Sequence, residues 1–462
     1  MPKLLRFTNL TRDTEIGANC YFLEWGDKRI VIDSGMHPKL EGWDSCPDYT
    51  PIADFDLDAI FLSHAHQDHV GTMPLLMRQQ PRAKVFMTYP TGRLGDVMLH
   101  NSVNVMVRQR EETGNPAYPL FTHREVNNVV SRWSYIPLRH QMNLEGDRAV
   151  PDPEELTFEM IDAGHILGSA GIIFRFGGRT VLYTGDVNFG NQTLSQAAKF
   201  PEKDIDVLVI ETTRGDNPTA PAWAREAEEK RFGQAVCEAF DRGGSILIPV
   251  FAIGKTQEIL TILHKMRCAE QLPDSVPIYI GGLSAKMTMI HDELSRGVPR
   301  QHAGLQLLDT VAPYILGGKE AQNASPGRGK IFAISSGMMT EKTLSNVFGR
   351  KFLSDKMHSV FFVGYADPES PGGKLRVAPH GSEVILDKDE PPVRVDASLE
   401  KFDFSAHSGR EQILDYILRV HPPVVILVHG SKQAVAWFET QLREKASDIK
   451  VIVPAPGVQI EI

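Results

Sequence analysis

The chain has 462 residues, of which 42% are hydrophobic and 23% charged, and its net charge is −9 at pH 7. This length predicts two or three domains, or one domain with a large insertion, while the acidic balance argues mildly against nonspecific binding to polyanions. The apolar runs are too short to cross a bilayer, no secretory signal is expected, and the four scattered cysteines favour a reducing compartment, so we expect a cytoplasmic protein without membrane association.

Short strands alternate with turns in the first part of the chain. The glycine pair at 177–178 predicts a two-residue hairpin turn, because it separates two apolar alternating runs. A helix is expected over residues 70–79. Strands are expected at residues 20–25, 29–33, 59–62, 171–176, 179–186 and 203–213.

After Arg214 the pattern changes to alternating helices and strands. Helices are expected over residues 218–240, 254–267 and 284–294, and buried strands over 243–250, 276–282, 330–339 and 358–366. Strands that alternate with helices at this spacing predict a parallel, doubly wound sheet.

Near residue 385 strands become frequent again. The simplest interpretation is a strand-rich body made of residues 1–214 and 386–462, interrupted by an α/β insertion at 215–385. These boundaries are expected to shift by several residues.

The sequence SHAHQDHVG at residues 63–71 places four ligand-type side chains within six positions, directly after an apolar run. His64 and His66 are two residues apart on extended chain, so both side chains can point to the same side. Asp68 and His69 are adjacent where a helix is expected to begin, so they diverge and can face a second ion. A single histidine here would be read as a surface residue, but this cluster predicts a metal site that suits zinc.

Five further residues stand at strand ends or in the loops that follow, as expected for a site along one edge of a sheet. Each has an ordinary alternative: the aspartates can cap turns, and the histidines can be core or surface residues. Together with the motif they predict one metal centre; they are Asp33, His165, Asp186, His407 and His429.

These motifs resemble a known family. SHAHQDHVG, DAGHILGSA and YTGD match the signature of the metallo-β-lactamase fold, and IETTRG, FSAHSG and LVHG resemble the three extra motifs of its β-CASP subgroup. The resemblance runs over nearly the whole chain and is nearest to prokaryotic relatives of the endonuclease subunit of the cleavage and polyadenylation specificity factor. It implies an αββα sandwich with an inserted α/β domain, in which helices flank a parallel sheet. It also implies a ribonuclease with two zinc ions.

The resemblance implies a role for each motif residue. One zinc ion would be held by His64, His66 and His165, and the other by Asp68, His69 and His429. Asp186 would bridge both ions, and Asp33 would orient the ligands from behind.

Glu211 would hydrogen-bond His407 and keep it protonated, so that His407 serves as the general acid. Two cations lower the pKa of a shared water, which attacks phosphorus in line while His407 protonates the departing 3′ oxygen. The products would be a 5′-phosphate and a 3′-hydroxyl. The expected catalytic set is therefore Asp68, Asp186, Glu211 and His407.

Two positions depart from the family pattern. Gly409 stands where an acidic residue is frequent, and Arg214 stands where tyrosine is usual. The second change bears on how the nucleotide is gripped and not on metal binding.

Three alternatives remain beside RNA hydrolysis. Small-molecule hydrolases of the superfamily share the metal motif but lack the insertion and FSAHSG. A DNA-directed nuclease is closer, although His429 favours RNA. A catalytically silent scaffold subunit would have lost ligands that are all present here.

Contacts to substrate are less well marked. The turn before Lys255 and the run Ser335-Ser336-Gly337 can each offer helix N-terminal N–H groups to a phosphate, or be ordinary strand-to-helix turns. Phe251 and Tyr365 are candidate stacking platforms. The expected partner is single-stranded RNA, with a homodimer or an RNA-processing complex as the assembly, and the choice between endo- and exonuclease stays open.

Overall fold

The computed structural model describes residues 3–150, 152–220, 222–317, 321 and 324–462. The chain folds into two compact units. The first unit comprises Met1–Gly190, Ala197–Thr219 and His407–Ile462, and the second comprises Asn191–Gln196 and Ala220–Ala406.

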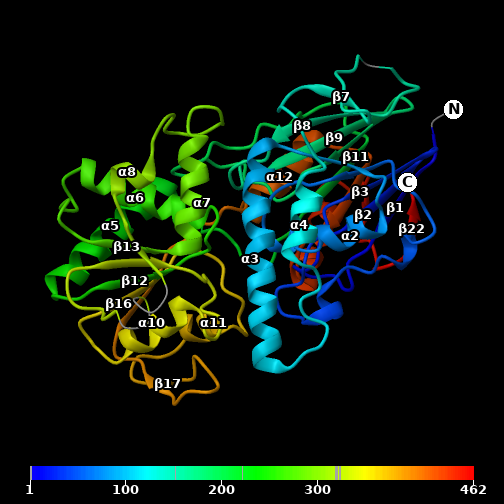
Figure 1. Cartoon of the computed structure of the whole chain (residues 1–462). Coiled ribbons are helices and arrows are strands. Elements are labelled where there is room, and N and C mark those ends of the chain that lie inside the picture. The colour runs from blue at the N-terminus through cyan, green and yellow to red at the C-terminus, as the bar shows by residue number, and fades with distance from the viewer. Residues whose placement is uncertain (1–2, 151, 221, 318–320, 322–323) are drawn as a thin grey trace. The chain divides into compact units, whose positions relative to one another are not determined.

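The first unit contains two seven-stranded sheets (Figure 1). In the first sheet the strands from β1 to β3 pair antiparallel and those from β3 to β6 pair parallel. Its order is β22 (Gln459–Glu461), β1 (Leu5–Asn9), β2 (Tyr21–Trp25), β3 (Lys28–Ile32), β4 (Ala59–Phe61), β5 (Lys84–Met87) and β6 (Trp133–Tyr135).

The second sheet contains the predicted glycine hairpin. Gly177 and Gly178 both have positive φ, at 60° and 73°, which two-residue turns between antiparallel strands require. The sheet order is β21 (Lys450–Ile452), β20 (Val424–Val428), β11 (Val207–Glu211), β10 (Arg179–Tyr183), β9 (Ala170–Phe176), β8 (Thr157–Asp162) and β7 (Gln141–Asn143).

The two sheets pack face to face through one apolar core. Phe61 of the first sheet lies edge-on to Phe158 and Phe174 of the second, with ring centroids 4.7 and 4.9 Å apart. Helices cover the outer faces, so the layers follow the predicted αββα order. They are α1 (Gln67–Val70), α2 (Met73–Gln79), α3 (Tyr89–Thr113) and α4 (His123–Val130) on the first sheet, and α12 (Arg410–Val420) and α13 (Lys432–Lys445) on the second.

The second unit is built on one six-stranded sheet whose pairs are all parallel. Separate apolar clusters cover its two faces, which confirms the predicted doubly wound arrangement. The strand order is β14 (Tyr314–Leu316), β13 (Ile278–Gly281), β15 (Ile331–Ile334), β12 (Ile246–Pro249), β16 (Ser359–Phe362) and β19 (Ser398–Lys401). The helices are α5 (Arg225–Asp241), α6 (Lys255–Cys268), α7 (Gly282–Glu293), α8 (Leu307–Val311), α10 (Leu344–Leu353) and α11 (Pro371–Arg376).

The units divide the chain differently from the expected boundaries. Residues 386–406 stay with the second unit because β19 pairs with β16. Segment 191–196 also belongs to this unit, since the buried carboxylate of Glu258 accepts the backbone N–H groups of Thr193 and Leu194. A small hairpin, β17 (Glu383–Val384) with β18 (Val393–Arg394), precedes β19.

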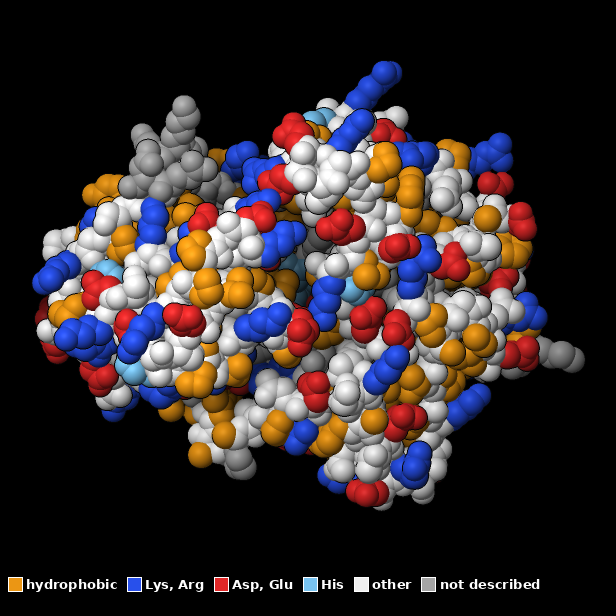
Figure 2. Space-filling view, turned by 90° about the horizontal axis from the view of Figure 1, so that it is seen from below, with side chains coloured by type: hydrophobic (Ala, Val, Ile, Leu, Met, Phe, Trp, Pro, Cys, Tyr) orange, Lys and Arg blue, Asp and Glu red, His pale blue; other side chains and the backbone are white. Residues whose placement is uncertain are grey.

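Basic and acidic side chains lie interspersed on the face shown in Figure 2, in keeping with the modest net charge. Among the described residues, no helix combines the length and apolarity that crossing a bilayer requires.

Candidate metal centre

The predicted ligands meet at one edge of the sandwich in the first unit. Strands β3 and β4 run parallel in one sheet, as do β10, β11 and β20 in the other, so their carboxyl ends lie together. Each of these strands delivers a candidate residue at or just beyond its last residue: Asp33, His64, Asp186, Glu211 and His429.

The first group of ligand atoms surrounds the Nδ1 atom of His66. This atom lies 3.2 Å from Nε2 of His64 and 3.0 Å from Nε2 of His165. Oδ2 of Asp186 faces the same group, 3.4 Å from the His64 nitrogen and 3.6 Å from the His165 nitrogen. Three imidazoles and one carboxylate oxygen therefore converge on one point.

The second group consists of Asp68, His69 and His429. Nε2 of His429 is 3.2 Å from Oδ2 of Asp68, and Nε2 of His69 is 3.8 Å from the same oxygen. The other carboxylate oxygen of Asp186, Oδ1, lies 3.4 Å from the His69 nitrogen and 3.6 Å from the His429 nitrogen. Asp186 thus presents one oxygen to each group.

These separations fit metal binding. Tetrahedral zinc with bonds of about 2.0–2.1 Å places its nitrogen and oxygen ligands roughly 3.3 Å apart, within the range seen here. Oδ1 of Asp186 is buried and accepts no hydrogen bond from the described residues. A buried carboxylate oxygen without a donor is costly, and a cation between the two groups would satisfy it.

Asp33 supports the ligands from behind. It is fully buried and has a left-handed backbone, with φ of 61°. Its Oδ2 accepts hydrogen bonds from the Tyr183 hydroxyl at 2.7 Å and the Ser63 hydroxyl at 2.8 Å, and it lies 2.8 Å from Nδ1 of His69. This contact holds the proton of His69 on Nδ1, so that Nε2, which also lies 3.1 Å from Nδ2 of Asn19, faces the second ligand group.

The electrostatics of the centre suit a cation. Burial lowers the pKa of His64 and His66, which keeps both in the neutral form that binds metal. Burial alone would raise the pKa of Asp68, but His69 and His429 lower it to about 2. The neighbouring histidines likewise hold the pKa of Asp186 well below its usual value, against the effect of burial. The carboxylates are therefore ionised.

A third group pairs His407 with a buried carboxylate. Nδ1 of His407 lies 3.0 and 3.1 Å from the two carboxylate oxygens of Glu211. Burial lowers the pKa of His407, but Glu211 more than offsets this and raises it above the usual value. The ring of His407 lies beside that of His165, with centroids 4.5 Å apart, so the pair adjoins the first ligand group.

The structure adds supporting residues that the sequence did not single out. Thr213 places its hydroxyl 2.8 Å from Nδ1 of His429, whose φ is 50°. The Thr212 hydroxyl donates to the carbonyl of Val428. The motif IETTRG contained both threonines, but their partners lie more than 200 residues away, so only the fold could pair them.

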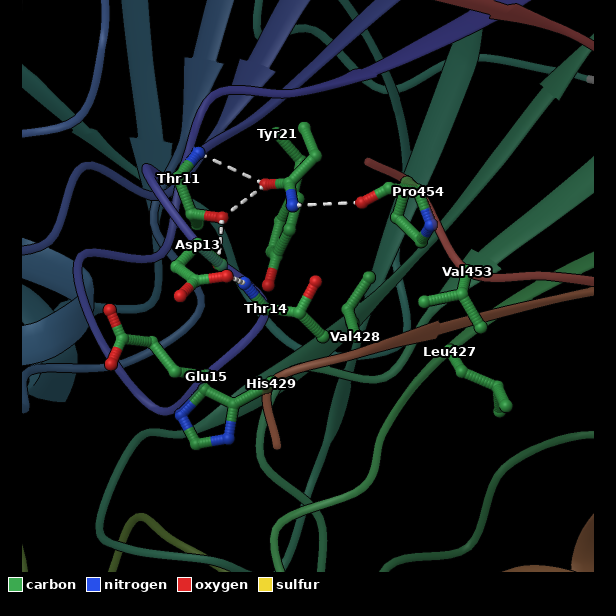
Figure 3. A pocket seen from close by; sticks show the side chains of 11 residues that line it. Thr11, Asp13, Thr14, Glu15, Tyr21, Leu427, Val428, His429, Val453 and Pro454 are labelled. Carbon is green, nitrogen blue, oxygen red and sulfur yellow. Dashed lines mark hydrogen bonds between the residues drawn. The ribbon is translucent and has the colours of Figure 1, made fainter. Parts of the chain in front are cut away.

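A small cavity of about 10 Å³, enough for roughly one water molecule, adjoins His429. The loop from Thr11 to Glu15 lines it (Figure 3). Asn9 holds this loop, accepting from the Thr11 backbone and hydroxyl and donating to the carbonyl of Pro454. The loop therefore closes one side of the space next to His429.

The expected phosphate contacts all belong to the second unit. Lys255 begins α6 as predicted, but it is buried and its ammonium donates to the carbonyl of Phe404, so it is not a surface lysine. Ser335, Ser336 and Gly337 follow β15, yet the next helix, α10, begins only at Leu344. A helix therefore follows these residues as expected, but turns held by the Ser336 hydroxyl come first and separate them from its N-terminus.

The two stacking candidates also differ in exposure. Tyr365 is 48% exposed in the second unit, whereas Phe251 is half-buried. The ring of Phe251 lies where a side chain on Gly337 would be, 3.0–3.1 Å from an ideal Cβ, so it packs against that loop.

Comparison with known families agrees with this geometry. Residues 13–85 match the metallo-beta-lactamase superfamily, residues 256–375 match the Beta-Casp domain, and residues 392–454 match the Zn-dependent metallo-hydrolase RNA specificity domain. The chain therefore carries segments of the metallo-β-lactamase and Beta-Casp kinds in the expected order, and the predicted resemblance and fold class are confirmed.

Two proteins of known name are similar to the chain over nearly its whole length. The chain is similar to cleavage and polyadenylation specificity factor subunit 3 of Dictyostelium discoideum, with 28% identity over 99% of the chain and 57% of the relative. It is 26% identical to endoribonuclease YSH1 of Eremothecium gossypii, over 96% of the chain and 57% of the relative. The chain thus spans little more than half the length of these relatives.

A solved structure shares the fold. The crystal structure of a protein of unknown function from Enterococcus faecalis V583 matches 99% of this chain and 100% of its own, with a TM-score of 0.58. At 14% sequence identity this likeness supports the fold alone.

Proposed function

We propose that the protein is a zinc-dependent ribonuclease that hydrolyses RNA phosphodiester bonds and leaves a 5′-phosphate and a 3′-hydroxyl. The carrying observation is the position of Asp186, with one oxygen toward each of two ligand groups and the Glu211–His407 pair alongside. One of the similar proteins is named an endoribonuclease, which supports RNA as the substrate.

Two zinc ions fit the donor set. His64, His66 and His165 would hold one ion, and Asp68, His69 and His429 would hold the other, with Asp186 shared. When bound, zinc supplies a nucleophile from water near neutral pH and neutralises charge on the phosphoryl oxygens. The chain's own contribution is to hold imidazoles and ionised carboxylates at fixed separations in a buried site.

His407 is proposed as the general acid. Glu211 accepts the Nδ1 proton, so the Nε2 proton is the one available to the departing 3′ oxygen. Glu211 is held in place by the backbone N–H of Val187 at 2.7 Å and that of Thr213 at 3.3 Å, which keeps its carboxylate fixed under the imidazole. Glu211 can therefore keep His407 oriented and protonated before substrate binds.

An RNA-processing complex is the proposed assembly. The relative from Dictyostelium discoideum is named as a subunit of the cleavage and polyadenylation specificity factor, which supports this proposal. Single-stranded RNA is the proposed substrate, because an extended strand exposes its phosphates to a buried metal centre.

The test is incubation of the zinc-loaded protein with single-stranded RNA labelled at the 5′ end or internally, with single-stranded DNA of the same sequence in parallel. We expect RNA cleavage that a chelator abolishes and zinc restores, with 3′-hydroxyl ends on mapping. His421→Ala, at an exposed histidine paired with Asp448, is the matched control for His429→Ala. Cleavage of DNA alone, or none in the zinc-replete protein, would overturn the proposal.

A further inference from the structure

Two exposed tyrosines lie together on the first unit. Tyr89, the first residue of α3, is 43% exposed, and Tyr135, the last residue of β6, is 41% exposed. Their ring centroids are 5.1 Å apart and the rings meet edge to face, at 88°. Exposed aromatic pairs of this kind leave ring faces open to a ligand.

The pair is held in a fixed arrangement. The Tyr135 ring rests on the backbone of α3 at Gly92, where an added Cβ would lie only 2.4 Å from the ring. The Arg93 guanidinium lies 5.8 Å from the centre of the Tyr89 ring and donates to its hydroxyl at 3.1 Å. A glycine beneath one ring and an arginine beside the other define this platform, and the carboxylate of Asp96 also acts on Tyr135.

The platform is tied to the loop that carries a metal-binding histidine. The hydroxyls of Thr88 and Thr91, at the start of α3, both donate to the carbonyl of Gly168, at 2.7 and 2.8 Å. Gly168 lies three residues after His165 in the same loop. Tyr89 also follows β5, the parallel neighbour of β4, so it leaves the sheet at the same edge as His64.

We propose that Tyr89 and Tyr135 form a stacking platform for a base of single-stranded RNA close to the bond that is cut. This inference rests on the proposed ribonuclease function and adds a substrate contact to it. Bases stack on aromatic rings without sequence preference, and an adjacent arginine favours the neighbouring phosphate. Paired bases are already stacked inside a duplex, so the platform selects unpaired strands.

The test measures binding and cleavage of a fluorescent single-stranded RNA by the zinc-loaded protein. Tyr89→Leu and Tyr135→Leu are expected to weaken binding about tenfold each, since a stacked base contributes strongly to affinity. Tyr89→Phe keeps the ring and should stay within about twofold of wild type. Tyr314→Leu, which removes a similarly exposed tyrosine from the edge strand β14 of the second unit, is the matched control.

A second measurement changes the RNA. Wild-type protein is assayed on RNAs in which a single abasic nucleotide is moved along the strand. An abasic nucleotide at one position near the cut site should lower kcat/KM of the wild-type protein about tenfold. In the Tyr89→Leu variant, which already lacks the stacking ring, the same abasic nucleotide should cause no further decrease. If the leucine variants bound RNA as tightly as wild type, or if the abasic scan showed no sensitive position, the stacking platform would be refuted while the proposed function would stand. Wild-type protein that neither binds nor cleaves RNA would overturn the proposed function as well.

Discussion

Replacing Asp33 by asparagine tests how the second ligand group is held. Asparagine has the same shape and tolerates the left-handed backbone at this position. Oδ1 of Asp33 accepts the backbone N–H of Ser63, so the amide nitrogen must take the place of Oδ2, facing His69 and Tyr183. The hydroxyl groups of Ser63 and Tyr183 can rotate and accept a hydrogen bond from this amide. Nδ1 of His69 can accept one only if it loses its proton. That proton then moves to Nε2, the atom that points toward Asp186.

The expected magnitude follows from this change of tautomer. Loss of an orienting carboxylate behind a metal-binding histidine lowers affinity about 10- to 100-fold, or roughly 1.4–2.7 kcal/mol. The effect should fall on the ion held by Asp68, His69 and His429 and spare the other. Loss of the charged acceptor should also lower the free energy of unfolding by about 1.5–3 kcal/mol.

The assay is zinc content per chain after equilibration with a series of zinc buffers. Asp33→Asn should show one site of wild-type affinity and one weakened site. Tyr183→Phe is the control, because it removes one donor to Asp33 without changing the tautomer of His69. Two sites of unchanged affinity in Asp33→Asn would refute the argument.

Three further predictions follow from other parts of the structure. His407→Ala should lower the cleavage rate about 10²- to 10⁴-fold while zinc content stays the same, whereas Asp186→Ala should lose zinc; equal metal loss in both would contradict the assigned roles. Phe61→Ala should lower the free energy of unfolding by about 3–5 kcal/mol in denaturant titrations, because Phe61 joins both sheets, and a loss under 1 kcal/mol would count against a shared core. Burial lowers the pKa of His291 from 6.5 to about 4, so the unfolded chain binds this proton at a higher pH than the folded chain does. The free energy of unfolding should therefore fall by about 3 kcal/mol as the pH drops from about 6.5 to about 4. His291→Gln stays neutral and should reduce this acid loss in unfolding measured at both pH values; an unchanged loss would show that His291 is not its source.

The candidate metal ligands could be predicted from the sequence because each stands in a short motif at a strand end. Five histidines and two aspartates in such motifs indicate metal chemistry before any fold is known. Their division into two groups depended on the resemblance, since spacing along the chain does not say which side of Asp186 a residue will face. Tyr183 and Thr213 escaped notice because their partners are distant in the chain.

Other features were hidden for physical reasons. Helix α3 has 25 residues, yet only one side of it packs against the sheet, and its mixed polar sequence gave no clear signal. Lys255 suggested a surface contact, but the fold buries it with the backbone of Phe404. The chain does not return to the first unit near residue 386, as the sequence predicted. Strand β19 belongs to the second unit because it pairs with β16, and this pairing cannot be recognised from the sequence of the strand.

The second unit is inserted into the sequence of the first, and this affects the order in which the candidate site is completed during synthesis. Glu211 and His407 are 196 positions apart in sequence. One edge of β11 stays unpaired until β20, which is synthesised later still, pairs with it. Because synthesis proceeds from the N-terminus and distant pairings form late, the part of the sandwich made first lacks both His407, the proposed general acid, and His429 until the second unit has been made. A chain that ends before these two residues is therefore expected not to cleave RNA.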